Sequence, residues 1–240
     1  MKTMRPEACV VPIVVSTETH KISELLGTGF FIQLSSGIGL MSARHVFDKR
    51  PLNDGEKYAY VFKSGDQIQI WALNKIIASD KFDIAITPEI ELKDALALPI
   101  AQSGPALNDE ILSYEYSYSQ ISLDPAGGDA VTFTPLCHKG NVVSYFESTY
   151  PEKVPTPSLL TSFPAFQGAS GAPIIWVNRT QKEFSIAGMI VGNLETEMMP
   201  AQTVKIQDGD SYSEETRYFH SYGKGIQRKV LSDFIASIGT

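Results

Sequence analysis

Ser170 stands in a loop whose residue types could build a nucleophile. Gly168 precedes it by two positions, Gly171 follows it directly, and an apolar stretch continues to Ile175. Because glycine has no side chain, the backbone around Ser170 can adopt turns that are closed to other residues and can bring its amide groups close to a reacting carbonyl oxygen. This pattern favours attack by a serine hydroxyl on a carbonyl carbon.

A serine hydroxyl needs a base that takes its proton and a third group that orients the base. His45 can be the base, at the end of an apolar stretch that begins at Gly37. Asp83 stands directly before the apolar run that starts at Ile84, and Asp80 is an alternative carboxylate three positions earlier. The order histidine, aspartate, serine is that of chymotrypsin-type triads and differs from the orders in subtilisin and the α/β-hydrolases.

Short motifs follow one another along nearly the whole chain. They are Gly27–Ile32, Ser42–Val46, Phe82–Ile86, Gly168–Pro173 and Ile186–Gly192. Each is common by itself, but in this order and at these separations they resemble the motifs of trypsin-like, chymotrypsin-fold serine peptidases of the bacterial, unprocessed kind. The last motif resembles the strand that lines the specificity pocket in that family.

The resemblance implies a role for each residue. Ser170 would attack a peptide carbonyl while His45 takes its proton and later returns it to the leaving amine. Asp83 would hold the imidazole in one tautomer, and it is preferred to Asp80 because the family pattern places the acid immediately before Ile-Ala-Ile. The amides of Gly168 and Ser170 would form the oxyanion hole. This chemistry needs no metal and no organic cofactor.

The family alignment also implies a substrate pocket. Its base falls in residues 162–165, which include Pro164, with Gln167 at the entrance and Gly192 and Asn193 along one wall. No acidic residue stands where trypsin-like enzymes bind arginine or lysine, so we expect an uncharged or apolar substrate side chain.

Ala169 departs from the pattern of family members that are made as zymogens. In those members an aspartate directly before the nucleophile pairs with the N-terminus released by cleavage. An alanine side chain carries no charge, so that switch cannot operate here. We therefore expect an oxyanion hole that forms without N-terminal cleavage.

Short apolar runs between turn signals predict an all-β fold, and 240 residues suffice for one domain. The resemblance implies two packed six-stranded antiparallel β-barrels with a C-terminal α-helix. We expect residues 1–100 to form the first barrel with His45 and Asp83, 107–223 the second with Ser170, and 224–240 the helix. The expected strands are 9–15, 28–34, 37–42, 58–62, 67–73 and 84–87 in the first barrel, and 110–118, 130–134, 141–146, 159–163, 172–177, 184–191 and 216–220 in the second.

From Gly225 to Ile238 the apolar residues recur with a helical period, which predicts an amphipathic helix packed on the second barrel.

Charge and cysteine content narrow the partners and the compartment. The formal net charge is -7, and no basic cluster interleaves with aromatic residues, so nucleic acid and membranes are poor candidates. A protein or peptide substrate fits better, and a regulatory protein is a further candidate partner.

Cys9 and Cys137 are too few for a secreted disulfide framework. The first apolar run is short and interrupted by proline, so it does not fit a signal peptide, and we expect a cytoplasmic protein. Secreted relatives hold the histidine loop with a neighbouring cysteine, whereas Val46 stands here, so packing must hold His45.

Other interpretations remain open beside an active endopeptidase. One is a binding module with the protease fold that is catalytically silent or activated by a partner. An α/β-hydrolase esterase is disfavoured, because Ala172 replaces the last glycine of its nucleophile motif and His45 precedes the serine. The polar segment 194–215 fits either a simple solvated hairpin or an element that gates the pocket or repels acidic substrates.

Overall fold

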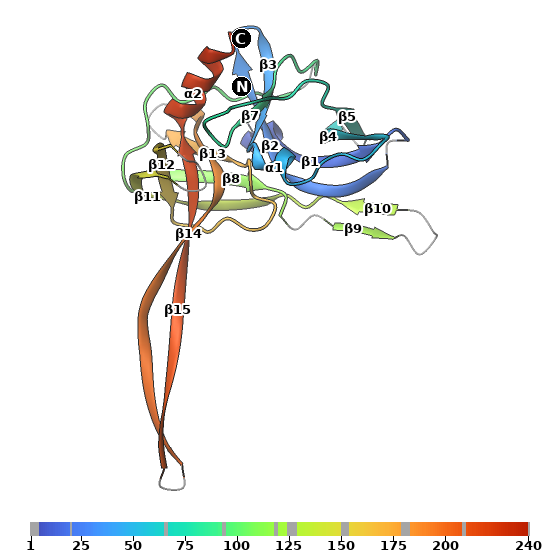
Figure 1. The fold of residues 1–240 in the computed structure, drawn as a ribbon. Coiled ribbons are helices and arrows are strands. Elements are labelled where there is room, and N and C mark those ends of the chain that lie inside the picture. Colours follow the sequence, from blue (N-terminus) through green and yellow to red (C-terminus); the bar gives the residue numbers. More distant parts are fainter. Residues whose placement is uncertain are drawn as a thin grey trace.

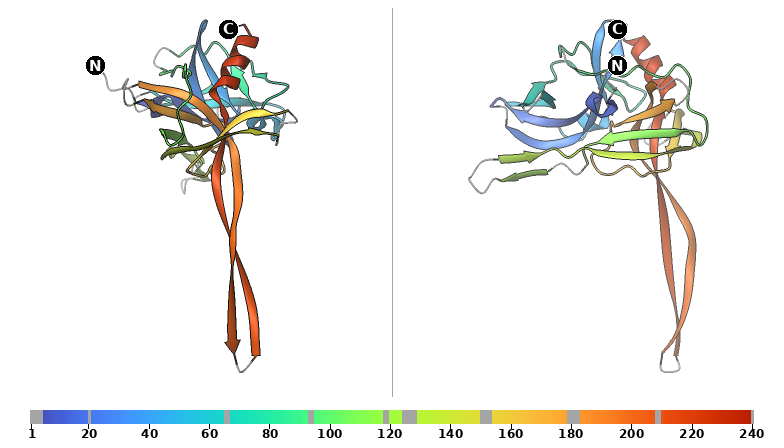
Figure 2. Two further views of the ribbon diagram at one scale, coloured as in Figure 1. Left: turned by 90° about the vertical axis from the view of Figure 1, so that its left-hand side faces the viewer. Right: turned by 180° about the vertical axis from the view of Figure 1, so that it is seen from behind.

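The computed structural model describes residues 5–19, 21–64, 67–92, 95–117, 120–123, 129–149, 154–178, 183–207 and 210–239. Two antiparallel sheets form the body of the molecule, and a long two-stranded ribbon projects from one of them (Figure 1). The views in Figure 2 show the same ribbon standing away from the body. In the described part of the chain, no helix has the length and apolar character needed to cross a membrane.

The first sheet contains seven strands in the order β5–β4–β1–β2–β3–β7–β6. They are β1 (Val10–Thr17), β2 (Ile22–Leu34), β3 (Gly37–Ser42), β4 (Glu56–Ser64), β5 (Gln67–Ala72), β6 (Ile77–Ala78) and β7 (Ala85–Thr87). The prediction of six strands was one short, because β6 has only two residues and is defined by its pairing with β7 rather than by a local pattern. Among the described residues β5 and β6 do not pair, so this sheet stays open between them.

The second sheet is the predicted six-stranded barrel. Its strands follow the order β11–β12–β15–β14–β13–β8, and β8 closes the ring by pairing with both β13 and β11. They are β8 (Glu110–Glu115), β11 (Leu136–Ser148), β12 (Thr156–Thr161), β13 (Pro173–Asn178), β14 (Glu183–Gln207) and β15 (Asp210–Gln227). Buried and half-buried residues alternate along β8, as expected for a strand with one face toward a core.

One predicted strand of this barrel lies elsewhere. Residues 130–134 were expected in the barrel, but β10 (Asp129–Thr132) pairs with β9 (Gln120–Leu123) in a separate hairpin. The place beside β8 belongs to β11, which begins at Leu136 opposite Glu115 and is long enough to close the ring. Alternating apolar residues predict a strand but do not name its partner.

The last two strands are longer than predicted. The pairing of β14 with β15 runs from Gly188 opposite Gln227 to Gln207 opposite Asp210. The segment 194–215 therefore continues both strands as a ribbon instead of interrupting them. Its side chains between 197 and 218 lie outside what the structure describes.

The C-terminal helix α2 (Arg228–Ser237) begins four residues later and ends three residues earlier than the predicted 224–240. Gly225 and Ile226 still belong to β15, since they pair with Ile190 and Met189 of β14. The helix buries its apolar stripe against the second barrel, as the periodicity predicted. Its buried residues are Val230, Leu231 and Phe234.

A single apolar core joins the two halves. It includes Phe30 and Phe31 of the first sheet together with Met189 and Ile226 of the second, all fully buried. The connecting segment is bonded to both sheets, because Leu98 exchanges hydrogen bonds with β2 while Pro99 and Ala101 bond to Ile186 of β14. The barrels are therefore held in a fixed relation, which is needed for a site built from both.

Candidate active site

Asp83 holds the His45 side chain. Its Oδ2 lies 2.5 Å from Nδ1 of the imidazole, and its Oδ1 accepts the backbone N–H of the same histidine at 2.8 Å. Asp83 is 7% exposed. Because Nδ1 faces the carboxylate, Nε2 is the nitrogen that faces away from it. A base in this arrangement presents one defined nitrogen to a neighbouring hydroxyl.

The short helix α1 (His45–Asp48) positions the histidine directly after β3. The Tyr58 hydroxyl lies 2.8 Å from the carbonyl oxygens of both Phe47 and Arg50. The Arg44 guanidinium donates a hydrogen bond to the Ser79 carbonyl at 2.7 Å, and Val46 is buried. Packing and hydrogen bonds thus hold the histidine turn, as the absence of a neighbouring cysteine led us to expect.

A tight turn positions the acid. The buried Ser79 hydroxyl accepts the backbone N–H groups of Lys81 and Phe82, and the Ser79 N–H donates to the Ile84 carbonyl at 2.9 Å. This turn directs Asp83 inward and leaves Asp80 exposed. Of the two carboxylates that the sequence offered, the structure brings Asp83 to His45.

The glycines beside Ser170 are required by the backbone. Gly168 has φ +98° and Gly171 has φ +86°, both in the left-handed region that disfavours side chains. A Cβ on Gly171 would overlap the Thr28 carbonyl oxygen and the Ser42 hydroxyl. The nucleophile loop can therefore dock against the end of β3 only because glycine stands at this position.

Ser170 docks beside the histidine turn through its backbone. Its carbonyl oxygen accepts the Thr28 N–H at 2.9 Å. A Cβ on Gly27 would lie 2.9 Å from that same oxygen and 2.9 Å from Cγ2 of Val46, the residue after His45. Within the described part of the chain, Ser170 Oγ makes no hydrogen bond to the His45 ring. Such bonds are often long in proteases without substrate.

Among the described residues, two amides of the loop around Ser170 have no hydrogen-bond acceptor. The neighbouring amides are used: Ala169 N–H donates to Phe166, Gly171 N–H to Ile190 and Ala172 N–H to Ala169. The N–H groups of Gly168 and Ser170 donate to no carbonyl among the described residues. These are the two amides that the resemblance assigned to the oxyanion hole.

Thr28 was not singled out in the sequence, yet it ties this loop to both barrels. Its hydroxyl donates to the Gly168 carbonyl at 2.8 Å and accepts the Tyr116 N–H at 3.1 Å. Its own carbonyl accepts the Ser42 hydroxyl at 2.7 Å. Thr28 is fully buried. The only sequence signal was its place between two glycines in an early strand.

An ionisable pair of buried Glu115 and half-buried His138 supports the loop from the other side, and the sequence did not predict it. His138 Nε2 lies 3.0 Å from Glu115 Oε1, and that oxygen also accepts the Ser117 hydroxyl. Glu115 is 1% exposed. The His138 ring stacks on Phe163 and contacts Phe166, both with centroids 5.4 Å away, in the segment that leads to Ser170.

The predicted pocket residues are only partly assembled. Asn193 bonds through its side chain to the backbone of Ala165, which joins β14 to the segment that contains Pro164. Gln167 is exposed. At Gly192 a Cβ would meet no atom within 4 Å, so open space lies beside that wall.

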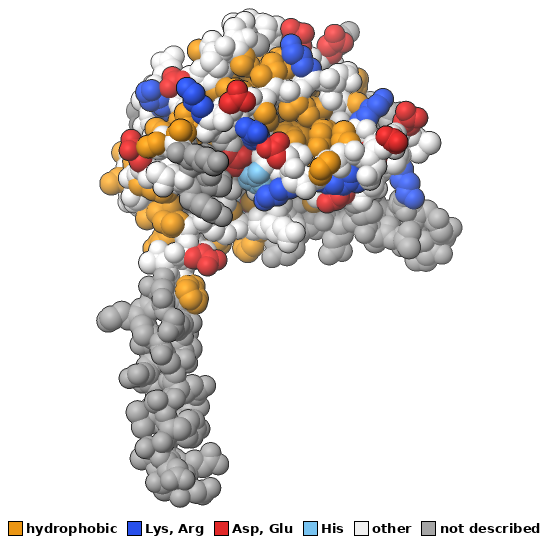
Figure 3. Space-filling model, in the orientation of Figure 1, with side chains coloured by type: hydrophobic (Ala, Val, Ile, Leu, Met, Phe, Trp, Pro, Cys, Tyr) orange, Lys and Arg blue, Asp and Glu red, His pale blue; other side chains and the backbone are white. Residues whose placement is uncertain are grey.

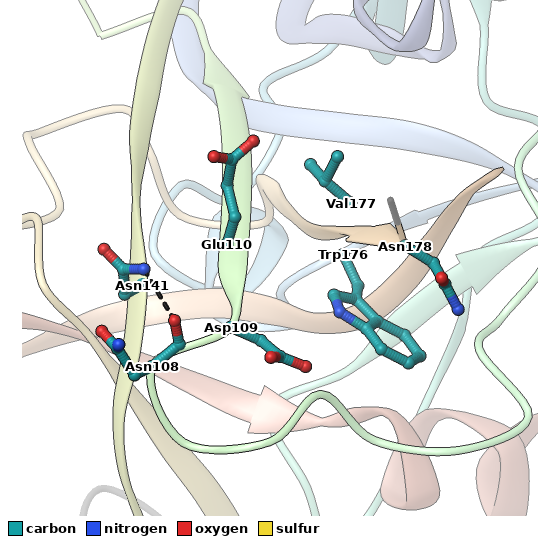
Figure 4. A pocket seen from close by; sticks show the side chains of 7 residues that line it. All are labelled: Asn108, Asp109, Glu110, Asn141, Trp176, Val177 and Asn178. Atoms are coloured by element: carbon teal, nitrogen blue, oxygen red, sulfur yellow. Dashed lines mark hydrogen bonds between the residues drawn. The ribbon is translucent and has the colours of Figure 1, made fainter. Parts of the chain in front are cut away.

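A separate cavity of about 410 Å³ lies on the second barrel and includes none of the predicted site residues. Figure 4 shows the side chains of Asp109, Trp176 and Asn178 around it, and the bond from Asn141 to the Asn108 carbonyl. Asp109 Oδ2 accepts a hydrogen bond from the Ala106 N–H at 2.8 Å. On the face in Figure 3, basic and acidic side chains are interspersed.

The two antiparallel sheets and the C-terminal helix form a chymotrypsin-like fold. No family model matches the sequence, and no curated protein matches it. The fold is instead shared with solved serine proteases.

The Rv3671c protease from M. tuberculosis in its active form matches with a TM-score of 0.58 and 17% identity, over 98% of this chain and 82% of that chain. Its inactive form matches with a TM-score of 0.55 and 17% identity, over 98% and 91%. The HtrA-type protease AlgW with a decapeptide matches with a TM-score of 0.59 and 16% identity, over 98% and 65%. At these identities the likeness establishes the fold alone.

Proposed function

We propose that the protein is a serine endopeptidase that hydrolyses peptide bonds through His45, Asp83 and Ser170. The observation that supports this most directly is the double engagement of His45 by buried Asp83, on Nδ1 and on the backbone N–H. This engagement leaves Nε2 as the ring nitrogen that faces away from the carboxylate, as a general base requires. The likeness to solved proteases supports the same class of enzyme.

The proposed reaction assigns one role to each of these groups. Ser170 Oγ attacks the substrate carbonyl carbon while His45 Nε2 takes its proton, and the carbonyl oxygen becomes an oxyanion facing the amides of Gly168 and Ser170. The imidazolium, stabilised by Asp83, then protonates the leaving amine and an acyl-enzyme forms. Water attacks the ester with His45 again as the base, which releases the acid and restores Ser170.

This oxyanion hole needs no charged N-terminus. Ala169 is fully buried and has no charge to pair with one, while Thr28 and Ser117 contact Gly168 from two sides. We expect an active preparation to retain the residues before Val10 when its intact mass is measured. Activity that arises only after their removal would contradict this.

A partner-activated binding module is the second candidate. It is favoured by one observation, that Ser170 Oγ and the His45 ring are not hydrogen-bonded in the described structure. In such a protein a bound partner would bring the two groups together.

A fluorophosphonate probe distinguishes the two candidates. We expect an adduct on Ser170, located by peptide mass spectrometry, that is absent in Ser170→Ala and strongly reduced in His45→Ala. Circular dichroism would verify that each variant is folded. Absence of labelling in the folded wild-type protein would contradict the endopeptidase and favour the partner-activated module.

A further inference from the structure

The side chain of Asn193 is bonded to both backbone groups of one residue across the predicted pocket. Its Oδ1 accepts the Ala165 N–H at 2.7 Å, and its Nδ2 donates to the Ala165 carbonyl oxygen at 2.8 Å. A carboxamide has one acceptor oxygen and two donor hydrogens, so this pairing uses its acceptor and one of its donors on the backbone of a single residue. Both distances are those of well-formed hydrogen bonds.

This contact joins two walls that lie beside the nucleophile. Ala165 belongs to the segment that leads to Ser170, and Asn193 follows Gly192 on β14. The adjacent part of β14 is fixed next to the nucleophile loop, because Ile190 exchanges hydrogen bonds with Gly171 and Ala172. A substrate side chain placed between these walls therefore meets the Asn193–Ala165 contact.

The segment that leads to Ala165 is packed against β15 at Phe163. The Gly223 N–H of β15 donates to the Phe163 carbonyl at 2.7 Å. A Cβ on Gly223 would lie only 2.7 Å from that oxygen and would overlap the Thr161 hydroxyl. On this side the strand and the segment are already in close contact.

Open space lies beside Gly192, where a Cβ would meet no described atom within 4 Å. Asn193 itself is exposed, so its amide lies at the surface between the two walls. The Asn193 side chain therefore narrows the opening between the two walls.

We propose that the Asn193–Ala165 contact limits the size of the substrate residue before the scissile bond to glycine, alanine or serine. The inference rests on the proposed peptidase function and makes Asn193 its specificity-determining residue. A large residue at that substrate position would have to break both hydrogen bonds between Asn193 and Ala165.

A peptide library that varies this substrate position tests the inference in the wild-type protein, with fluorophosphonate labelling of Ser170 measured in parallel. We expect cleavage after Gly, Ala or Ser to exceed cleavage after Leu, Phe, Lys or Glu. Asn193→Ala removes the contact and should raise the ratio of kcat/KM for Leu over Ala by about 10-fold or more, which is within the range for pocket-size changes. Asn74→Ala, at an exposed position of the first sheet, is the matched control and should leave the ratio unchanged.

Each outcome bears on one claim. Best cleavage after a large or charged residue by labelled wild-type protein would overturn the size limit while leaving the peptidase function standing. The size limit would also be overturned if folded Asn193→Ala is still labelled at Ser170 and its ratio of kcat/KM for Leu over Ala is unchanged. Absence of both labelling and cleavage in wild-type protein would overturn the peptidase function and the size limit with it.

Discussion

Thr28 Oγ1 donates a hydrogen bond to the Gly168 carbonyl oxygen at 2.8 Å, although 140 positions separate the two residues. The same peptide unit donates its N–H, that of Ala169, to the Phe166 carbonyl. Both ends of the peptide that follows Gly168 are thus fixed, which constrains the direction of the free Gly168 N–H. An oxyanion hole is effective only when its donors are oriented before the reaction.

Replacing Thr28 by valine keeps its shape but removes this hydroxyl. We expect Thr28→Val to slow fluorophosphonate labelling of Ser170 by about 10- to 100-fold, less than the 10²- to 10³-fold typical of losing a donor outright. Thr28→Ser, which keeps the hydroxyl, should label at close to the wild-type rate. Equal labelling rates for the valine and serine variants would show that the hydroxyl does not orient the loop.

Asp83→Asn should abolish most activity while the fold persists. The introduced side-chain amide can hold the His45 imidazole in the wrong tautomer and cannot stabilise the imidazolium, an effect of about 10⁴-fold in kcat in triad enzymes. Asp80→Asn is the control, since Asp80 is exposed on the outer side of the same turn. Peptide hydrolysis rates would check both. Similar losses in the two variants would contradict the assignment of Asp83.

Removing the Glu115 carboxylate should destabilise the second barrel. Glu115→Ala leaves the half-buried His138 without its partner, and removing one partner of such a hydrogen bond costs about 1–3 kcal/mol in the free energy of unfolding. Lys139→Ala, which removes the exposed neighbour that pairs with Glu110, should cost less than about 1 kcal/mol. Urea unfolding followed by fluorescence would measure both. Equal small effects would mean that the Glu115–His138 pair adds nothing to stability.

The two cysteines should differ in reactivity. Burial raises the pKa of the Cys9 thiol to about 12, whereas Cys137 is exposed. At pH 8 roughly 10⁻⁴ of Cys9 would be thiolate, so a thiol reagent should modify Cys137 first and Cys9 only on unfolding. The raised pKa favours the protonated thiol in the folded state, so its contribution to stability is present at neutral pH and is lost as the pH rises toward 12. Two rapidly reacting thiols in native protein would contradict this.

Shortening the ribbon should not disturb the barrel. Deletion of Glu197 to Ser213 leaves Thr196 opposite His220 and a loop of six residues between them. We expect short peptides to be cleaved within about twofold of the wild-type rate, because the pairing of β14 with β15 beside Ser170 is kept. If the ribbon gates the pocket or repels acidic substrates, the deletion should change the peptide preference. An identical preference would identify it as a solvated hairpin.

The sequence was most informative where the chemistry depends on local backbone. Glycine at 168 and 171 predicted turns that only glycine adopts, and both have positive φ in the structure. Most strands and the final helix were predicted because alternation and a 3.6-residue period are properties of short segments. Strand ends and strand partners were less certain, which is why β10 was placed in the wrong sheet and β6 was missed.

By itself, the sequence determined the residue types a hydrolase of this fold requires, their order, and the glycines that let the nucleophile loop turn. Only the tertiary structure decided which carboxylate meets His45, that Thr28 holds Gly168, that Asn193 reaches Ala165 and that Glu115 pairs with His138. The physical reason is that each of these contacts joins residues brought together by sheet pairing and barrel packing. Local propensity carries no information on which residues far apart in the sequence become neighbours.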